Sequence, residues 1–124
     1  MRRRTVMLGI AVAAVALVAA ACGTSTSRTL VPGGDPANGK RLIEHFGCGS
    51  CHEIAGIEGA GGRVGPSLRH LQDRRLIAGR IGNNPRNATR WIMDPQRIEP
   101  GTVMPDLGVS EREARDIVAY LYAH

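Results

Sequence analysis

Apolar residues recur at helical spacing in three segments of the chain, and each segment begins with its own start signal. The first predicted helix starts with Asp-Pro at residues 35–36 and ends at Gly47, and the second starts with Asn-Pro at residues 84–85 and stops at Asp94. A capping side chain followed by proline suits the first turn of a helix. The third starts at residue 110 with Ser-x-x-Glu, a capping box. The apolar positions are Ala37, Leu42, Ile43 and Phe46, then Ala88, Trp91 and Ile92, then Ala114, Ile117, Val118 and Leu121.

The segments between these helices predict no sheet. Residues 58–65 form a glycine-rich loop, and a shorter helix is expected around residues 67–72. Alternating strand patterns and internal repeats are absent. The predicted fold class is therefore all-α, with three to five helices.

The N-terminal pattern differs, because residues 6–21 are an unbroken run of apolar or small residues behind three arginines. This is the layout of a secretory signal. Ala19-Ala20-Ala21-Cys22 resembles a bacterial lipoprotein signal, in which Cys22 is acylated, although Leu is more usual at residue 19. Residues 1–21 are also readable as an uncleaved anchor, although 16 apolar residues are fewer than the about 20 that a span needs. Soluble export after cleavage is the third alternative.

All three alternatives place the folded domain outside the cytoplasm. We expect it to be membrane-anchored on the extracytoplasmic side, in the periplasm or on the outer face of the cytoplasmic membrane. Residues 22–34 are small, polar and rich in Gly and Pro, which predicts a flexible tether. Residues 35–124 remain as one domain.

The charge balance argues against nucleic-acid binding. The formal net charge is +5, but three arginines lie in the N-terminal signal, and from Cys22 onward 13 basic residues face 11 acidic ones. A basic patch on the folded domain is therefore not indicated. Residues 35–124 contain four Phe, Trp or Tyr residues and many glycines, a thin core for a small domain. A large apolar cofactor would supply the missing core.

Cys48-Gly49-Ser50-Cys51-His52 is the candidate site for that cofactor, because C-x-x-C-H is the attachment pattern of one covalent haem c. Two thiols two residues apart can form thioethers to one porphyrin, and His52 can ligate the iron. A zinc site usually needs four ligands, and no second Cys or His pair is present. A thioredoxin-like pair would follow a strand, and a disulfide here would close only a tiny loop.

Met104 is the candidate for the second axial ligand. It lies in Pro100-Gly101-Thr102-Val103-Met104-Pro105, a loop restricted by two prolines, which can present a thioether with little further loss of entropy. The other candidates are Met93, His45, His70 and His124. A filled coordination sphere favours electron transfer, whereas an open iron would bind a gas or peroxide, as a sensor or enzyme does. A third alternative is an exported protein without haem, in which the motif is accidental.

Together these features resemble class I (monohaem) cytochromes c, over residues 35–124. The resemblance implies a small class I cytochrome c fold around one covalent haem. It also implies that the Pro66 carbonyl accepts a hydrogen bond from His52 Nδ1–H, that Leu68 touches the haem, and that Trp91 points its indole N–H at a propionate. Gly39 would let the first helix cross the last one near Tyr120. Ile43 departs from the family, which usually has an aromatic residue there.

The middle of the chain is similar to a narrower group, the cytochrome c domain fused to bacterial cytochrome c oxidase subunit II. The similarity rests on Gly-Pro-Ser-Leu-Arg-His at residues 65–70, Asn-Pro-Arg-Asn at 84–87, Arg-Trp-Ile-Met-Asp-Pro-Gln at 90–96 and the loop at 100–105. We expect the haem domain to occur here without the copper-binding domain of that subunit. The resemblance implies a membrane-tethered carrier of single electrons between respiratory-chain components, with a haem-copper terminal oxidase as a candidate acceptor. It implies redox protein partners, no small-molecule substrate and no enzymatic activity by itself. His70 and Arg74 or Arg75 could approach the propionates, or could equally be solvated surface charges.

Overall fold

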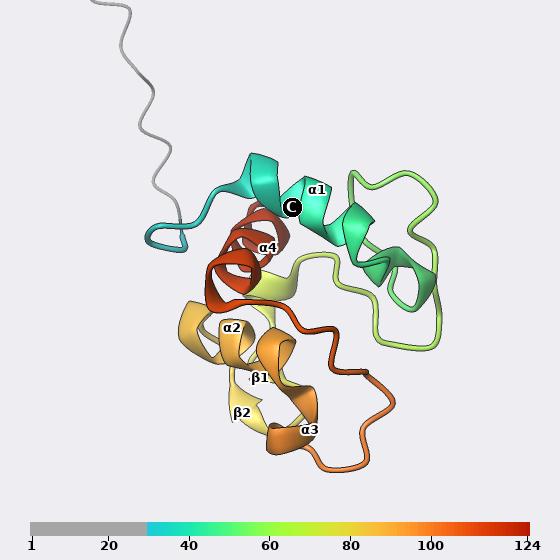
Figure 1. Ribbon diagram of the computed structural model, residues 1–124, viewed down its shortest axis with the longest axis vertical. Coiled ribbons are helices and arrows are strands. Elements are labelled where there is room, and N and C mark those ends of the chain that lie inside the picture. The colour runs from blue at the N-terminus through green and yellow to red at the C-terminus, as the bar shows by residue number, and fades with distance from the viewer. Residues whose placement is uncertain (1–29) are drawn as a thin grey trace, which may run out of the picture.

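The computed structural model describes residues 30–124. The signal or anchor at residues 1–21, Cys22 and most of the tether lie outside the described residues, so those predictions remain untested. The chain folds into α1 (Pro36–His45), α2 (Pro85–Met93), α3 (Pro95–Ile98) and α4 (Glu111–Ala123). Figure 1 shows α1 and α4 crossing at one end of the molecule, with α2, α3 and two short strands at the other.

The three long helices begin where the sequence predicts. The Asp35 carboxylate accepts from two backbone amides of the first turn of α1, and the Asn84 side chain accepts from one in α2. At α4 both halves of the capping box form between Ser110 and Glu113. These bonds satisfy amides that have no partner within the helix.

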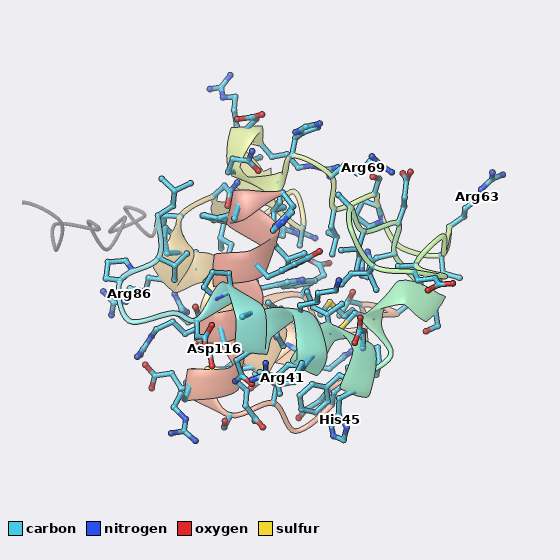
Figure 2. The ribbon with its side chains drawn as sticks, turned by 90° about the horizontal axis from the view of Figure 1, so that it is seen from above. Arg41, His45, Arg63, Arg69, Arg86 and Asp116 are labelled. Carbon is cyan, nitrogen blue, oxygen red and sulfur yellow. The ribbon has the colours of Figure 1, made fainter. Side chains whose placement is uncertain are left out.

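The crossing of α1 and α4 depends on Gly39. A Cβ atom at this position would lie 2.0 Å from the Asp116 carbonyl oxygen and 3.0 Å from Tyr120 Cβ, so only glycine allows the helices to approach this closely. The buried Asp116 carboxylate strengthens the crossing by accepting from Asp35 N and Asn38 Nδ2, both at 2.8 Å. Figure 2 shows Asp116 of α4 beside α1.

Three local predictions differ from the structure. Two strands, β1 (Leu76–Ile77) and β2 (Ile81–Gly82), pair antiparallel where no strand was expected. A two-residue strand is too short to show alternation, so the pattern could not reveal it. The helix expected around residues 67–72 is instead the single 3₁₀ turn η2 (Leu71–Asp73), and the short α3 follows Pro95, where helical structure was expected to stop. The Asp94 side chain caps α3 by accepting from Arg97 N at 3.0 Å.

The hydrophobic core lies between α4 and the remaining elements, and its most buried side chains come from α4. They include Ala114, Ile117, Val118, Ala119, Tyr120 and Leu121, packed against Val31, Ile43, Ile54 and Ala88. Among residues 30–124, no helix is both long enough and apolar enough to cross a membrane. The all-α prediction for a small class I cytochrome c fold is confirmed, apart from the two-stranded ribbon.

Candidate functional site

A largely apolar cavity of about 370 Å³ opens between segments that are distant in the sequence. The aliphatic part of its wall comes from core residues of α1, α2 and α4, including Ile43, Ala88, Ile117 and Leu121. The predicted site residues of the domain all reach this one cavity: Cys48, Cys51, His52, Pro66, Leu68, Trp91 and Met104.

The two thiols are placed by a tight turn that follows α1. Gly47 adopts a left-handed conformation with φ 69°, which redirects the chain into the 3₁₀ turn η1 (Cys48–Ser50). The amides of Cys51 and His52 then donate to the Cys48 carbonyl at 3.3 and 3.0 Å. Both thiols are free and half-buried, and burial raises the pKa of the Cys48 thiol. No disulfide therefore joins the pair, and both sulfur atoms are available for thioether bonds.

The His52 ring is positioned by one hydrogen bond and by close packing against the backbone. Its Nδ1 lies 2.7 Å from the Pro66 carbonyl oxygen, the contact that the resemblance implies. A carbonyl can only accept, so Nδ1 carries the proton and Nε2 keeps a free lone pair for a metal. Gly65 packs directly on the ring, because a Cβ atom there would lie 2.3 Å from His52 Cε1.

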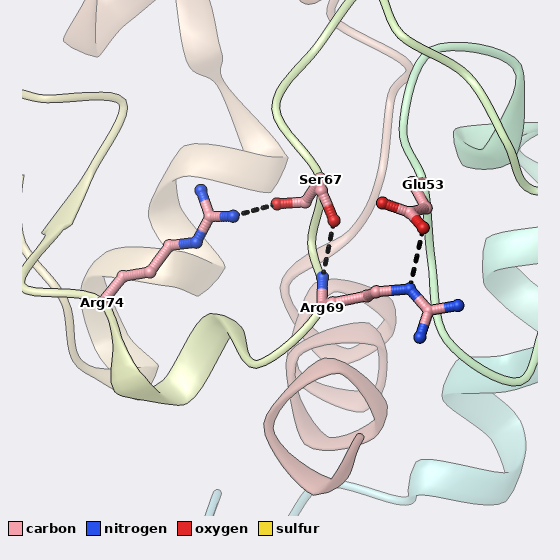
Figure 3. Close-up of polar contacts among 4 residues, drawn as sticks. All are labelled: Glu53, Ser67, Arg69 and Arg74. Atoms are coloured by element: carbon pink, nitrogen blue, oxygen red, sulfur yellow. Dashed lines mark hydrogen bonds and ion pairs between the residues drawn. The ribbon is translucent and has the colours of Figure 1, made fainter.

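The segment that carries Pro66 is itself tied to the attachment site. The amides of Gly65 and Leu68 donate to the Cys51 and Glu53 carbonyls, both at 2.8 Å. Figure 3 shows the side-chain contacts, in which Arg69 Nε donates to Glu53 at 2.9 Å. Arg74 bonds the Ser67 carbonyl, and a hydrogen bond from Ser67 is the largest cause that lowers the pKa of Glu53. The sequence did not reveal the Glu53–Arg69 pair, because its members are 16 residues apart across an irregular loop.

Met104 approaches the cavity from the loop between α3 and α4. The side chain is half-buried and lines the cavity together with Thr102 and Val103. The loop begins beside Glu99, whose carboxylate forms an ion pair with Arg80 at the β1–β2 ribbon. The loop therefore presents Met104 from a part of the chain remote from His52.

The competing ligand candidates lie elsewhere. None of Met93, His45, His70 and His124 lines the cavity. His45 is exposed and packs its ring edge against Phe46, and His124 stacks on Tyr120 with a ring separation of 4.2 Å. His70 is exposed in a left-handed conformation with φ 52°. The geometry thus singles out His52 and Met104 as donors that face one cavity.

The arginines of the domain do not gather on a single face. Figure 2 shows Arg63 and Arg69 on one side of the molecule and Arg86 on the other. Among the arginines of residues 30–124, only Arg74 lines the cavity, and Arg75 and His70 do not. Within residues 30–124, no group of three or more His, Cys, Asp or Glu side chains is arranged to hold a metal ion.

The residues of this cavity fit a covalently bound haem. Two free thiols, one imidazole with an available nitrogen and one thioether are the donor set that haem c uses. The wall between them is mainly apolar, as a porphyrin face requires. Gln96, which bonds the Met104 loop, was not identified from the sequence, because nothing in its local pattern distinguishes it from an ordinary surface glutamine.

Comparison with known proteins agrees with this fit. The family model described as cytochrome c matches residues 36–123. The chain is 36% identical over 84 residues to cytochrome c oxidase subunit 2 of Alkalihalophilus pseudofirmus, a match covering 67% of this chain and 24% of the relative. It is 34% identical over 59 residues to cytochrome c oxidase subunit 2 of Bacillus sp. (strain PS3), covering 46% of this chain and 17% of the relative. The chain thus matches about a quarter or less of the length of these relatives. The cavity, its donor set and the family match together establish that the chain belongs to the cytochrome c family, and that it is an electron-transfer protein that binds covalent haem c.

Proposed function

We propose that this protein is a membrane-tethered, monohaem electron carrier on the extracytoplasmic side of the membrane. In this proposal Cys48 and Cys51 would hold the haem, and His52 and Met104 would bind its iron. The protein passes single electrons between respiratory-chain components, with a haem-copper terminal oxidase as acceptor. The observation that carries the proposal is the convergence of these four side chains on one apolar cavity.

Haem c supplies an iron that changes by one electron between its ferric and ferrous states. The role of the chain is to keep the surroundings of that iron constant in both states. The Pro66 carbonyl fixes the tautomer and direction of the His52 ring, and the apolar wall excludes water from the cavity. Met104 would be the second protein ligand of the iron, which would leave no site for a gas or peroxide. Trp91 faces the cavity with an indole N–H that has no hydrogen-bond partner within residues 30–124, and it would donate to a propionate.

The mouth of the cavity suits brief docking of a protein partner. Exposed apolar side chains stand around it, namely Val64, Leu76, Val103 and Leu107, of which Val103 is 81% exposed. Exposed apolar groups gathered at one place mark interaction surfaces. The names of the two relatives support an oxidase as the partner, because both are subunits of cytochrome c oxidase.

The first experiment tests whether the haem iron has a free coordination position. The protein, expressed with haem-attachment machinery, should gain the mass of one haem and bind carbon monoxide slowly in the ferrous state. Met104→Ala should bind it rapidly and lose the weak red absorption of the ferric iron–sulfur bond. Rapid binding by the unaltered protein would instead support an open, gas-binding haem.

The second experiment tests the tether. Mass spectrometry of the mature N-terminus separates an acylated Cys22 from an uncleaved anchor. Cys22→Ser should release the protein from membranes if the lipid holds it there. Unchanged membrane association in this variant would favour an uncleaved anchor helix.

The third experiment tests the partner. The reduced protein, mixed with a purified haem-copper oxidase, should be oxidised at a rate that saturates with oxidase concentration. Val103→Asp should slow this reaction without changing the absorption spectrum, because it places a charge on the apolar rim. Leu30→Asp is the matched control, since Leu30 is 61% exposed but does not line the cavity. Equal rates for both variants would remove the cavity rim as the docking surface.

A further inference from the structure

We infer that Gln96 is a positioning residue that holds the Met104 loop in place, an inference that rests on the proposed ligation by Met104. Both polar atoms of its amide form hydrogen bonds with this loop. Nε2 donates to the Thr102 carbonyl at 2.7 Å and to the Met104 carbonyl at 3.1 Å. Oε1 accepts from Gly101 N at 3.1 Å. The three contacts also settle which amide atom is which, because Gly101 N can only donate and the two carbonyls can only accept.

The loop needs such support because its own backbone provides little. Residues 103–109 make no backbone–backbone hydrogen bond within the described part of the chain. Apart from Gln96, the loop near Met104 has the Thr102 N to Glu99 O turn bond and a long contact of 3.4 Å from Met104 N to Thr102 Oγ1. The prolines at residues 100 and 105 restrict the chain, but a proline ring supplies no hydrogen-bond donor.

Gln96 can act as a support because the short helix that carries it is anchored. Pro95 is among the most deeply buried side chains of the domain, and Asp94 caps the helix. Glu99 at its end is paired with Arg80 of the β1–β2 ribbon. Because this helix is anchored to the core, the hydrogen bonds of the Gln96 amide can hold the loop at a fixed position relative to the core. Gln96 itself is exposed, so each single bond competes with water and the effect depends on three bonds made together.

The test compares holoproteins that carry Gln96→Ala, Gln96→Glu and, as a matched control, Arg97→Ala. Arg97 lies on the same helix and is exposed, and its side chain makes no hydrogen bond to residues 30–124. Carbon monoxide binding to the ferrous protein should accelerate about tenfold in Gln96→Ala, a factor that corresponds to about 1.4 kcal/mol. Ferric iron–sulfur absorption should disappear at a milder pH or lower denaturant concentration than in the unaltered protein. Arg97→Ala should match the unaltered protein in both measurements.

Gln96→Glu separates hydrogen bonding from mere space filling. Glutamate has the same shape and retains an acceptor for Gly101 N, but its carboxylate faces two carbonyl oxygens. We therefore expect Gln96→Glu to bind carbon monoxide at least as fast as Gln96→Ala. A space-filling role predicts the opposite order, and that order would overturn the inference.

The outcomes also separate this inference from the proposed function. If the unaltered protein shows no iron–sulfur absorption and binds carbon monoxide rapidly, both fail, because Met104 is then no ligand. If the unaltered protein and both Gln96 variants bind carbon monoxide equally slowly, the inference about Gln96 is overturned and the proposed function stands. Global unfolding of all variants is measured in parallel, and the control fixes the size of effects unrelated to the loop.

Discussion

Replacing Gly65 with alanine should disturb the proposed iron ligand His52, because Gly65 packs directly against the imidazole ring. The new Cβ would lie 2.3 Å from Cε1, 2.6 Å from Nδ1 and 2.9 Å from Nε2 of the imidazole. Ordinary contact begins at 3.4 Å, so the ring and the Gly65 segment must separate by about 1.1 Å. The segment cannot slide freely, because the Gly65 amide is bonded to the Cys51 carbonyl at 2.8 Å.

Two magnitudes follow from this displacement. Overpacking costs about 1–3 kcal/mol, and about 2 kcal/mol lowers the melting temperature of a domain of this size by roughly 10 °C. A movement of about 1 Å also breaks the His52 Nδ1 to Pro66 hydrogen bond, which contributes about 1 kcal/mol. That bond makes the imidazole a stronger donor and so favours ferric iron, and its loss should raise the reduction potential. One kcal/mol corresponds to about 40 mV for one electron, which is the upper limit of the shift because only the difference in bond strength between the two oxidation states changes the potential.

The assay is a redox titration of the holoprotein together with thermal unfolding. Gly61→Ala is the matched control, because it lies in the same loop region, has no positive φ, and has nothing within 4 Å of its added Cβ. We expect Gly61→Ala to keep both the potential and the melting temperature. If Gly65→Ala also keeps both, the packing of this segment on His52 does not constrain the ligand, and the reasoning is refuted.

Three further predictions concern the rest of the domain. Gly39→Ala should lower the free energy of unfolding, measured with denaturant, by about 3 kcal/mol, because the new Cβ would clash with the Asp116 carbonyl. Alanine normally stabilises a helix relative to glycine, so a stabilised variant would contradict the close crossing of α1 and α4. The hydrogen bond from the Ser110 hydroxyl, with the other contacts of the capping box, lowers the pKa of Glu113. The carboxylate therefore stabilises the fold above its unfolded pKa of about 4.3, and this stability is lost as the pH falls through the lower folded pKa. Glu113→Gln should reduce the dependence of unfolding free energy on pH in this range, and an unchanged dependence would contradict the assignment. Burial raises the pKa of Tyr122 to about 12, so ultraviolet titration should find one phenol ionising well above 10, and joint ionisation of all tyrosines near 10 would contradict this.

The helices that the sequence predicted well are those with local signals at their ends. Asp35, Asn84 and Ser110 each satisfy amides within three residues of themselves, so their effect can be read without knowing the rest of the fold. The ribbon of β1 and β2 could not be found in this way. Its strands are two residues long and are joined through a turn in which Ala78 adopts an unusual φ of 52°.

The residues of the candidate site likewise include some that local sequence patterns predict and others that they do not. Cys48, Cys51 and His52 lie within five consecutive residues, so spacing alone predicts their chemistry, and the two prolines around Met104 mark a constrained loop. The supports of these residues could not be inferred from local pattern, because Glu53 reaches Arg69 and Gln96 reaches Met104 only after the loops have folded back. Hydrogen bonds between separated segments leave no periodic trace in a sequence.

The sequence by itself determined the cofactor and the helical class, and it predicted the attachment residues, because each depends on residues close together in the chain. Only the tertiary structure decided which of the competing methionines and histidines share a cavity with His52. Met93 and Met104 carry the same thioether, and what distinguishes them is that Met104 lines the cavity and Met93 does not. That difference arises from packing between elements that are distant in the sequence, and no local rule specifies it.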